Sequence, residues 1–201
     1  MLWGDCLNRK VKIVEAAKKS FTLFGYKATT VEQVAKIANV GKGTIYNFFE
    51  NKQELLQFVV KNLIDEMQSE AAKSLNPNNS FMTNAHNMLM RMLQFRDRHL
   101  LLAKLIEEER QFATPEVRNM LAKIEDEIVC YLAAHIQLGM EKGEIILCEP
   151  KQVAYLLLKA YKAFIVDWQA TYGEVMLEED ILNLFSATIF KGLAKKTADV
   201  H

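Results

Sequence analysis

The sequence predicts an all-α protein in which a small N-terminal helix-turn-helix domain of three helices is followed by a C-terminal helical bundle, with nine to ten helices in total. Three observations support this fold class. Half of the 201 residues are hydrophobic, which is enough for a substantial core. Only three prolines and eight glycines interrupt the chain, so long helices are favoured over many short strands. Apolar residues also recur at helical spacing in one segment after another.

The first helix is expected over residues 8–24. Asn8 offers a side-chain oxygen that can cap the start of this helix. The apolar residues that keep the spacing of one helical face are Val11, Val14, Ala17, Phe21 and Phe24. Gly25 is expected to end the helix, because glycine is common just past a helix terminus.

Three more helices are expected before residue 75. Thr29 and Thr30 offer hydroxyl groups that can cap the first of them, and Asn51 can cap the last. The expected ranges are 31–38, about 42–49 and about 52–74.

Beyond this point, turn-forming residues divide the rest of the chain into further helices. Residues 75–80 are rich in asparagine and contain a proline, which predicts a loop. Thr114 and Pro115 are typical of a helix start, and Gly143 of a helix end. The expected helices cover 81–98, the following residues to about 111, 115–142, 150–173 and 177–195. Residues 145–147 are apolar and too short to exclude as a strand.

The charge of the chain is unevenly distributed although its formal net charge is zero. Residues 1–56 hold nine Lys and Arg against five Asp and Glu, whereas residues 57–201 hold sixteen against twenty. A basic front and an acidic remainder favour a polyanion-binding end on an otherwise neutral body.

The cysteines and the hydropathy of the chain indicate the cellular compartment in which the protein is expected. Cys6, Cys130 and Cys148 form no C-x-x-C pair, which fits reduced thiols in a cytoplasmic protein. No apolar run reaches the roughly 20 residues that a membrane helix needs. The first residues also lack the basic and apolar regions of a secretion signal, so we expect a cytoplasmic location without membrane contact.

Residues 30–49 carry the pattern of a helix-turn-helix, in which two short helices pack at a steep angle. The residues expected to face the shared core are Val31, Val34, Ala35, Ala38, Val40, Ile45 and Phe48. Asn39 lies at the turn, where the backbone must be left-handed, and asparagine tolerates that conformation best after glycine. A plain helical hairpin with an apolar face remains the alternative to DNA binding.

Between residues 10 and 60 a series of short motifs follows in fixed order. They are Ile13–Ala17, Phe21, Phe24–Tyr26, Ala28–Val31, Ala35, Ala38, Val40–Phe49, Lys52 and Leu55. In order and spacing these motifs resemble the opening of the tetracycline-repressor (TetR) family. The resemblance implies a DNA-binding domain at residues 1–51 and a ligand-binding and dimerisation domain at 52–201.

The function that this resemblance implies is a ligand-responsive transcriptional regulator, most often a repressor. Such a protein binds a palindromic operator in double-stranded DNA as a homodimer and is released by a small molecule. Neither a cofactor nor a metal is implied. The alternatives are a helical interaction protein without operator binding and a helical enzyme. The enzyme is disfavoured because the sequence contains no G-x-S-x-G, no nucleotide-binding glycine loop and no H-E-x-x-H motif.

Several residues are expected to contact DNA. Tyr46 and Lys52 resemble the phosphate contacts of the family, and Gln33 can read adenine through its amide. Backbone N–H groups at the start of the third helix suit phosphate, and Gly41 and Gly43 allow close approach. The complete set is Thr29, Thr30, Gln33, Gly41, Lys42, Gly43, Thr44, Tyr46, Asn47 and Lys52.

Two positions of this set depart from the family. Gly41 stands where serine is usual, and Asn47 stands where histidine is usual, so the exact contacts at both remain open. Arg9, Lys10 and Lys12 lie at the start of the first helix and are interpreted either as contacts to phosphates or to the minor groove, or as a solvated basic end.

The C-terminal body offers candidate ligand contacts. Polar-tipped and aromatic side chains on apolar stripes suit a small-molecule pocket, although a plain core has the same composition. The candidates are His86, Tyr131, His135, Tyr161, Phe164 and Trp168. The acidic run 107–109 is interpreted as a solvated face. The dimer seam is expected on the last two helices, through the stripe Ile181, Leu184, Phe185, Thr188 and Ile189.

Overall fold

The computed structural model describes residues 2–94 and 100–195, with side chains from residue 7 onward. These residues form two compact units. The head unit comprises residues 2–68 and 100–123, and the body unit comprises residues 69–94 and 124–195. The described segments are helical, and counting each continuous run once gives nine helices among them. The predicted all-α fold class is confirmed.

The head unit begins with α1, Leu2–Ala28. The helix starts before the expected cap, so Asn8 lies inside it; no proline separates Asn8 from the residues before it, and the helix continues through. Gly25 interrupts the helix with a φ of 81° and a ψ of 172°, as expected for a glycine at its end. Ile13, Ala17 and Phe21 are fully buried along one face of α1.

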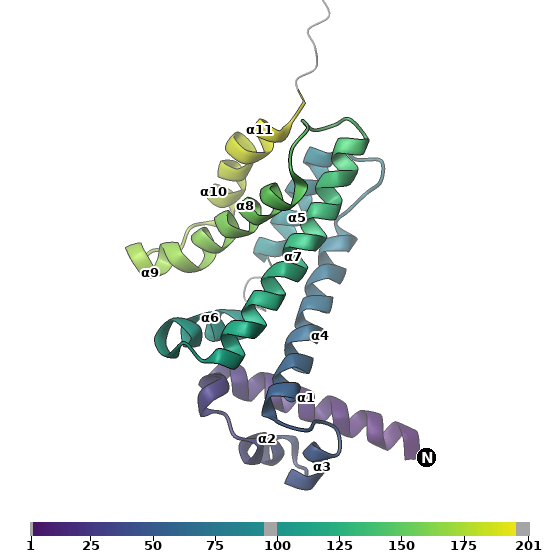
Figure 1. Ribbon diagram of the computed structural model, residues 1–201, viewed down its shortest axis with the longest axis vertical. Coiled ribbons are helices and arrows are strands. Elements are labelled where there is room, and N and C mark those ends of the chain that lie inside the picture. The colour runs from purple at the N-terminus through teal and green to yellow at the C-terminus, as the bar shows by residue number, and fades with distance from the viewer. Residues whose placement is uncertain (1, 95–99, 196–201) are drawn as a thin grey trace, which may run out of the picture. The chain divides into compact units, whose positions relative to one another are not determined.

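Two short helices pack beside α1. They are α2, Val31–Ala38, and α3, Lys42–Tyr46. In Figure 1 both lie on the same side of α1. Helix α3 ends earlier than residue 49 because the N–H groups of Phe48 and Phe49 both turn back to the carbonyl of Ile45.

The rest of the head unit comes from three longer helices. They are the first four turns or so of α4, Lys52–Lys73, all of α6, Leu100–Phe112, and the start of α7, Pro115–Glu141. Leu55, Leu56 and Val59 of α4 are buried. The acidic run before the end of α6 is not a solvated face throughout, because Glu108 is buried with only 4 % of its surface exposed. It follows Leu101 and Leu105 on the buried face of the same helix, at spacings of seven and three residues.

The body unit is built from the remaining helices. Helix α5 is Phe81–Gln94. Helix α8, Pro150–Lys162, continues through a π-helical segment, Ala163–Asp167, into α9, Trp168–Tyr172. Helix α10, Glu178–Phe185, continues through a second π-helical segment, Ser186–Phe190, into α11, Lys191–Leu193. Ile145 forms an isolated antiparallel bridge with Ala194 rather than a strand.

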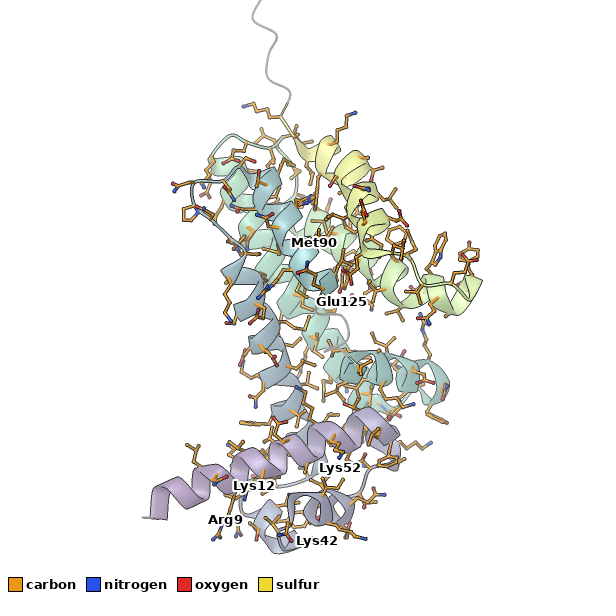
Figure 2. The ribbon with its side chains drawn as sticks, turned by 180° about the vertical axis from the view of Figure 1, so that it is seen from behind. Arg9, Lys12, Lys42, Lys52, Met90 and Glu125 are labelled. Atoms are coloured by element: carbon orange, nitrogen blue, oxygen red, sulfur yellow. The ribbon has the colours of Figure 1, made fainter. Side chains whose placement is uncertain are left out.

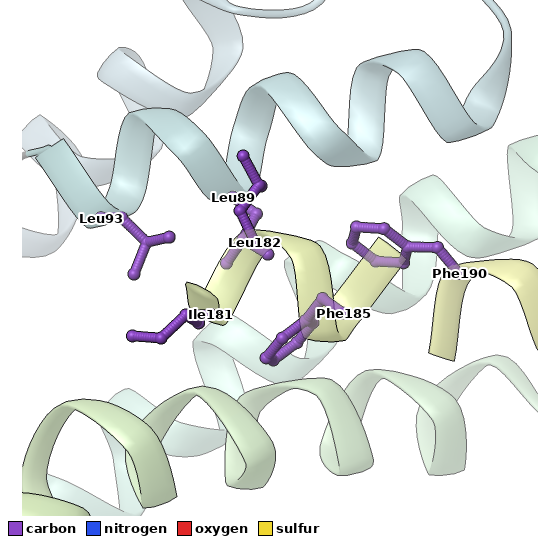
Figure 3. Close-up of a cluster of buried hydrophobic side chains, with 6 residues drawn as sticks. All are labelled: Leu89, Leu93, Ile181, Leu182, Phe185 and Phe190. Carbon is purple, nitrogen blue, oxygen red and sulfur yellow. The ribbon is translucent and has the colours of Figure 1, made fainter. Parts of the chain in front are cut away.

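The last helical run and α5 share a hydrophobic core in the body unit. Figure 3 shows its buried members, which are Leu89, Leu93, Ile181, Leu182, Phe185 and Phe190. The stripe expected to form the dimer seam is therefore divided. Ile181 and Phe185 are buried within their own chain, whereas Leu184 and Thr188 remain exposed. A second cluster joins α7, α8 and the bridge region through Val129, Ile136, Ile145, Ala154, Leu158 and Leu193.

Among the described residues, none of the helices combines the length and the apolar character needed to cross a membrane.

Candidate nucleic-acid interface

A capping box starts α2. The N–H of Gln33 donates to the hydroxyl oxygen of Thr30 at 3.2 Å, and the N–H of Thr30 donates to the side-chain oxygen of Gln33 at 2.9 Å. Each side chain thus satisfies a backbone donor that the helix leaves free. Both residues are exposed, and the capping bonds fix where their side chains lie.

The turn between α2 and α3 adopts the left-handed conformation expected at Asn39, with a φ of 54° and a ψ of 48°. The N–H groups of Asn39 and Val40 close the end of α2 on the carbonyls of Lys36 and Ala35. Helices α2 and α3 are in contact, and Ala35 of α2 and Ile45 of α3 are both buried, as a close crossing of the two helices requires. This packing fixes α3 against α2.

The outer face of α3 is exposed. Gly41, Lys42, Gly43, Tyr46 and Asn47 are exposed, and Thr44 is half-buried. Gly43 has no positive φ, and a Cβ added there meets nothing within 4 Å. The internal packing of the head unit therefore does not require glycine at this position.

An ion pair links the two helices on this face. Lys42 Nζ lies against the carboxylate of Glu32 and 5.7 Å from the centre of the Tyr46 ring. The hydrogen bond from Lys42 lowers the pKa of Glu32, and the same bond raises the pKa of Lys42. Sequence reasoning did not include Glu32, since nothing in the spacing of residues 32 and 42 predicts that they meet.

Thr29 and Lys52, also in the expected DNA-contacting set, bond backbone carbonyls at residues 25–29. Thr29 is fully buried, and its hydroxyl donates to the carbonyl of Gly25 at 2.7 Å. Lys52 Nζ donates to the carbonyls of Tyr26 and Thr29, both at 2.9 Å. A buried hydroxyl cannot reach DNA, and two of the three N–H bonds of the lysine are directed into the protein.

Gln33 is only partly available for base reading. Its side-chain oxygen accepts the Thr30 N–H, so the amide NH₂ is the group left to face outward. Bidentate reading of adenine needs both the oxygen and the NH₂ of the amide, and it would compete with the capping box.

The basic residues at the start of α1 divide into two groups. Arg9 and Lys12 are exposed and extend from α1 toward the side on which α3 and Lys42 lie (Figure 2). Lys10 instead places its ammonium over two aromatic rings, 4.2 Å from that of Phe58 and 5.5 Å from that of Phe49. Arg9 and Lys12 thus fit the basic edge proposed from sequence, and Lys10 has a packing role.

The candidate ligand residues all lie in the body unit. Tyr131 and His135 contact each other on α7, with ring centroids 4.5 Å apart. Within the described part of the chain, the buried Tyr131 hydroxyl has no hydrogen-bond partner, and burial raises the pKa of this tyrosine. A buried hydroxyl without a partner is uncommon in a plain core.

The other four candidates come from α5, from α8 with its π-helical continuation, and from α9. The Tyr161 hydroxyl donates to the carbonyl of Met92 at 3.4 Å, and His86 Nδ1 lies 3.4 Å from the hydroxyl of Ser186. Phe164 and Trp168 pack with ring centroids 6.3 Å apart. Tyr161 and Phe164 pack against the core cluster of Figure 3, so they serve at least partly as core.

Comparison with known proteins gives a consistent result. A family model described as "Bacterial regulatory proteins, tetR family" matches residues 13–59. A protein of Bacillus subtilis (strain 168) described as "Uncharacterized HTH-type transcriptional regulator YhgD" is 41% identical over 188 residues, covering 94% of this chain and 98% of that protein. The HTH-type transcriptional regulator HbdR of Aromatoleum sp. is 36% identical over 68 residues, which are 34% of this chain and 30% of that protein.

Solved structures share the fold at low sequence identity. Salmonella enterica GusR matches with a TM-score of 0.75 at 17% identity, covering 92% of this chain and 95% of that one. The fatty acid degradation regulator FadR from Bacillus halodurans matches with a TM-score of 0.74 at 17% identity, covering 90% of this chain and 96% of that one.

Proposed function

Because the chain belongs to the TetR family of bacterial regulatory proteins and is a DNA-binding transcriptional regulator, we propose that it is a cytoplasmic repressor that binds a palindromic operator as a homodimer and is released by a small molecule. The observation that carries the proposal is the exposed outer face of α3, held against a capped α2 by the left-handed turn at Asn39. A short helix held in this way can enter the major groove of DNA.

The proposed DNA-facing residues are those of the expected set that remain at this surface. Lys42 supplies positive charge, while the Tyr46 hydroxyl and the Asn47 amide can bond phosphate oxygens or base edges. Gly43 leaves room for the DNA backbone to approach the protein backbone. The proposed set is Thr30, Gln33, Gly41, Lys42, Gly43, Thr44, Tyr46 and Asn47, with Arg9 and Lys12 as additional phosphate contacts.

Operator binding is tested with full-length protein and a randomised duplex library. Repeated selection should enrich a site with two symmetric halves. Its dissociation constant should rise steeply with salt, because each phosphate contact releases a counterion. Lys42→Met should lower the slope of log affinity against log salt by about 0.9, the value for one phosphate contact. Enrichment of no sequence, or of a site with a single half, would count against a palindromic operator.

The dimer is proposed from apolar side chains that the body unit leaves exposed. On α8, Tyr155 and Leu156 are 49 % and 55 % exposed, and on α10 Leu184 is 38 % exposed. Exposed large apolar residues on neighbouring helices suit a second copy of the same surface. Gly192 of α11 is exposed, and an added Cβ there meets nothing within 4 Å, which leaves room for a second copy to approach the backbone.

The small molecule is proposed to bind in the body unit, near the Tyr131 hydroxyl. A ligand acceptor would satisfy this buried group, and the ring of His135, 4.5 Å from that of Tyr131, offers an aromatic contact to an apolar or amphipathic molecule. Since FadR is described as a regulator of fatty acid degradation, fatty acids and their thioesters are the first molecules to screen for release of the selected operator. If an active molecule binds Tyr131→Phe and wild-type protein equally well, Tyr131 is not its contact.

A further inference from the structure

The backbone from the interruption of α1 at Gly25 to the residue before the α2 cap is bonded by charged side chains from two other helices of the head unit. We call residues 25–29 the link. On one side Lys52 of α4 donates to the carbonyls of Tyr26 and Thr29, both at 2.9 Å. On the other side the carboxylate of Glu108, from α6, accepts the N–H groups of Tyr26 at 2.5 Å and of Lys27 at 3.0 Å. The link is therefore bonded by a cation at its carbonyls and by an anion at its amides.

Glu108 fits this position closely. It is buried, and it also accepts a hydrogen bond from the Thr114 hydroxyl at 3.2 Å. A buried carboxylate is costly unless donors surround it, and here each of its three partners is a donor. At Gly25 a Cβ would come within 2.5 Å of Glu108 Oε2, so the link can approach the carboxylate only with glycine at this position.

Lys52 is directed into the head unit as well. Its ammonium lies 4.3 Å from the centre of the Tyr26 ring, in addition to its two bonds to carbonyls. Burial lowers the pKa of Lys52, and the nearby charges of Glu108 and Glu116 oppose that change. The ammonium of Lys52 is thus partly dehydrated where it binds the link. A lysine that only contacted phosphate would not require this dehydration within the protein.

We propose that Lys52 and Glu108 are positioning residues for operator recognition, which hold the link and thereby set the orientation of α2 and α3, and that Lys52 serves in this way rather than as a phosphate contact. The link runs directly into Thr30, which caps α2, so its backbone position sets where α2 begins. Among the bonds to the link that residues 2–94 and 100–195 make, those of Glu108 come from farthest along the sequence, 81 and 82 residues away. This inference rests on the proposed operator binding.

Three roles for these residues give three different binding signatures. A phosphate contact contributes equally to all DNA, and its loss lowers the salt slope by about 0.9. A positioning residue matters most where base contacts need exact geometry, so its loss lowers affinity for the operator more than for unrelated DNA. Loss of a residue that serves stability alone changes neither the ratio of operator affinity to affinity for unrelated DNA nor the salt slope, as long as the protein is folded.

The experiment compares Lys52→Met and Glu108→Gln in the full-length protein. Two matched controls are Lys61→Met, an exposed lysine of α4 paired with Asp65, and Glu107→Gln, the exposed neighbour of Glu108. Dissociation constants are measured for the duplex selected by wild-type protein and for an unrelated duplex. The salt concentration is varied, and the temperature is kept where circular dichroism shows each variant to be folded.

Both test variants should lose about tenfold or more in affinity for the selected duplex, the size expected from one charge-assisted hydrogen bond. Affinity for unrelated DNA and the salt slope should stay nearly unchanged, and the controls should match wild type. Equal losses on both duplexes with a slope lower by about 0.9 for Lys52→Met would overturn the inference in favour of a phosphate contact. An unchanged operator preference in folded variants would overturn it in favour of a purely structural role.

If Glu108→Gln does not fold, Lys52→Met decides alone, since it keeps the buried carboxylate and its three donors intact. A wild-type chain that selects no sequence overturns operator binding and this inference with it. Selection of an operator followed by unchanged preference in the variants overturns this inference only.

Discussion

Glu32 and Lys42 join α2 to α3 by an ion pair on the exposed face of the head unit, and each changes the pKa of the other. The hydrogen bond from Lys42 lowers the pKa of Glu32 below its ordinary value of 4.5. The folded-state pKa is thus the lower one, so the pair is fully present above about pH 4.5 and is lost as the pH falls through the lowered pKa.

This pairing is measurable by carbon NMR of the glutamate carboxyl groups. In wild-type protein the Glu32 signal should titrate below pH 4.5, and in Lys42→Met its pKa should rise toward that value. Glu107, whose pKa is lowered by the hydrogen bond from Lys104, serves as the control signal and should keep this lowered pKa in both proteins. Identical Glu32 titrations in the two proteins would show that the pair does not form in solution.

Replacing Gly43 with alanine is expected to change the stability of the protein and its DNA affinity in opposite directions. An added Cβ meets nothing within 4 Å, and alanine in a helix is favoured over glycine by about 0.5 to 1 kcal/mol, so Gly43→Ala should raise the melting temperature. The same methyl group should weaken operator binding, because it occupies the space proposed for the DNA backbone. Thermal unfolding and operator titration check the two effects, and an unweakened affinity would show that DNA does not approach here.

At the scale of elements, the turn between α2 and α3 depends on the left-handed conformation of Asn39. Left-handed backbone costs most residues roughly 1 to 2 kcal/mol, more than it costs asparagine or glycine. Asn39→Val should therefore lower the free energy of unfolding by about this amount, while Asn39→Gly should change it by less than about 0.5 kcal/mol. Urea unfolding measures both, with Lys36→Ala as a control on the exposed face of α2. Equal stabilities of the valine and glycine variants would contradict this explanation of the turn.

At the scale of the whole molecule, self-association through the exposed side chains of α8 and α10 is the feature most open to test. Leu156→Glu combined with Leu184→Glu should convert the protein to a monomer, because a dimer seam would then bury uncompensated charge. Leu147→Glu is the matched control, since Leu147 is 88 % exposed in the connection between α7 and α8. Sedimentation velocity should show a dimer for the control. A dimeric double variant would place the seam elsewhere.

Regulation also belongs to this scale. A small molecule that weakens operator binding 100-fold needs a coupling free energy of about 2.7 kcal/mol. Reciprocity then requires the operator to weaken ligand binding by the same factor. Calorimetric titration of an active molecule into free and operator-bound protein should give affinities that differ 100-fold. Equal affinities would mean that the molecule does not act as an inducer.

The sequence by itself determined the local features of this protein. Sparse breakers and helical periodicity predicted the all-α fold, and capping residues and glycines predicted helix ends at Gly25, Thr30 and Pro115 within a few residues. Asn39 was recognised as the left-handed residue of the turn. These predictions succeeded because capping, backbone conformation and periodicity depend on residues only a few positions apart.

Only the tertiary structure decided which side chains meet across the chain. Glu108 stands in an acidic run that resembles a solvated face, yet it is buried against the link more than 80 residues before it. Lys52, a predicted phosphate contact, bonds two carbonyls within the head unit, and Phe185, predicted in a dimer seam, packs in the core shared with α5. Each of these outcomes depends on the packing of helices that are distant in sequence. Local sequence patterns do not show which buried donors will surround a charged side chain, or which hydrophobic core an aromatic ring will join.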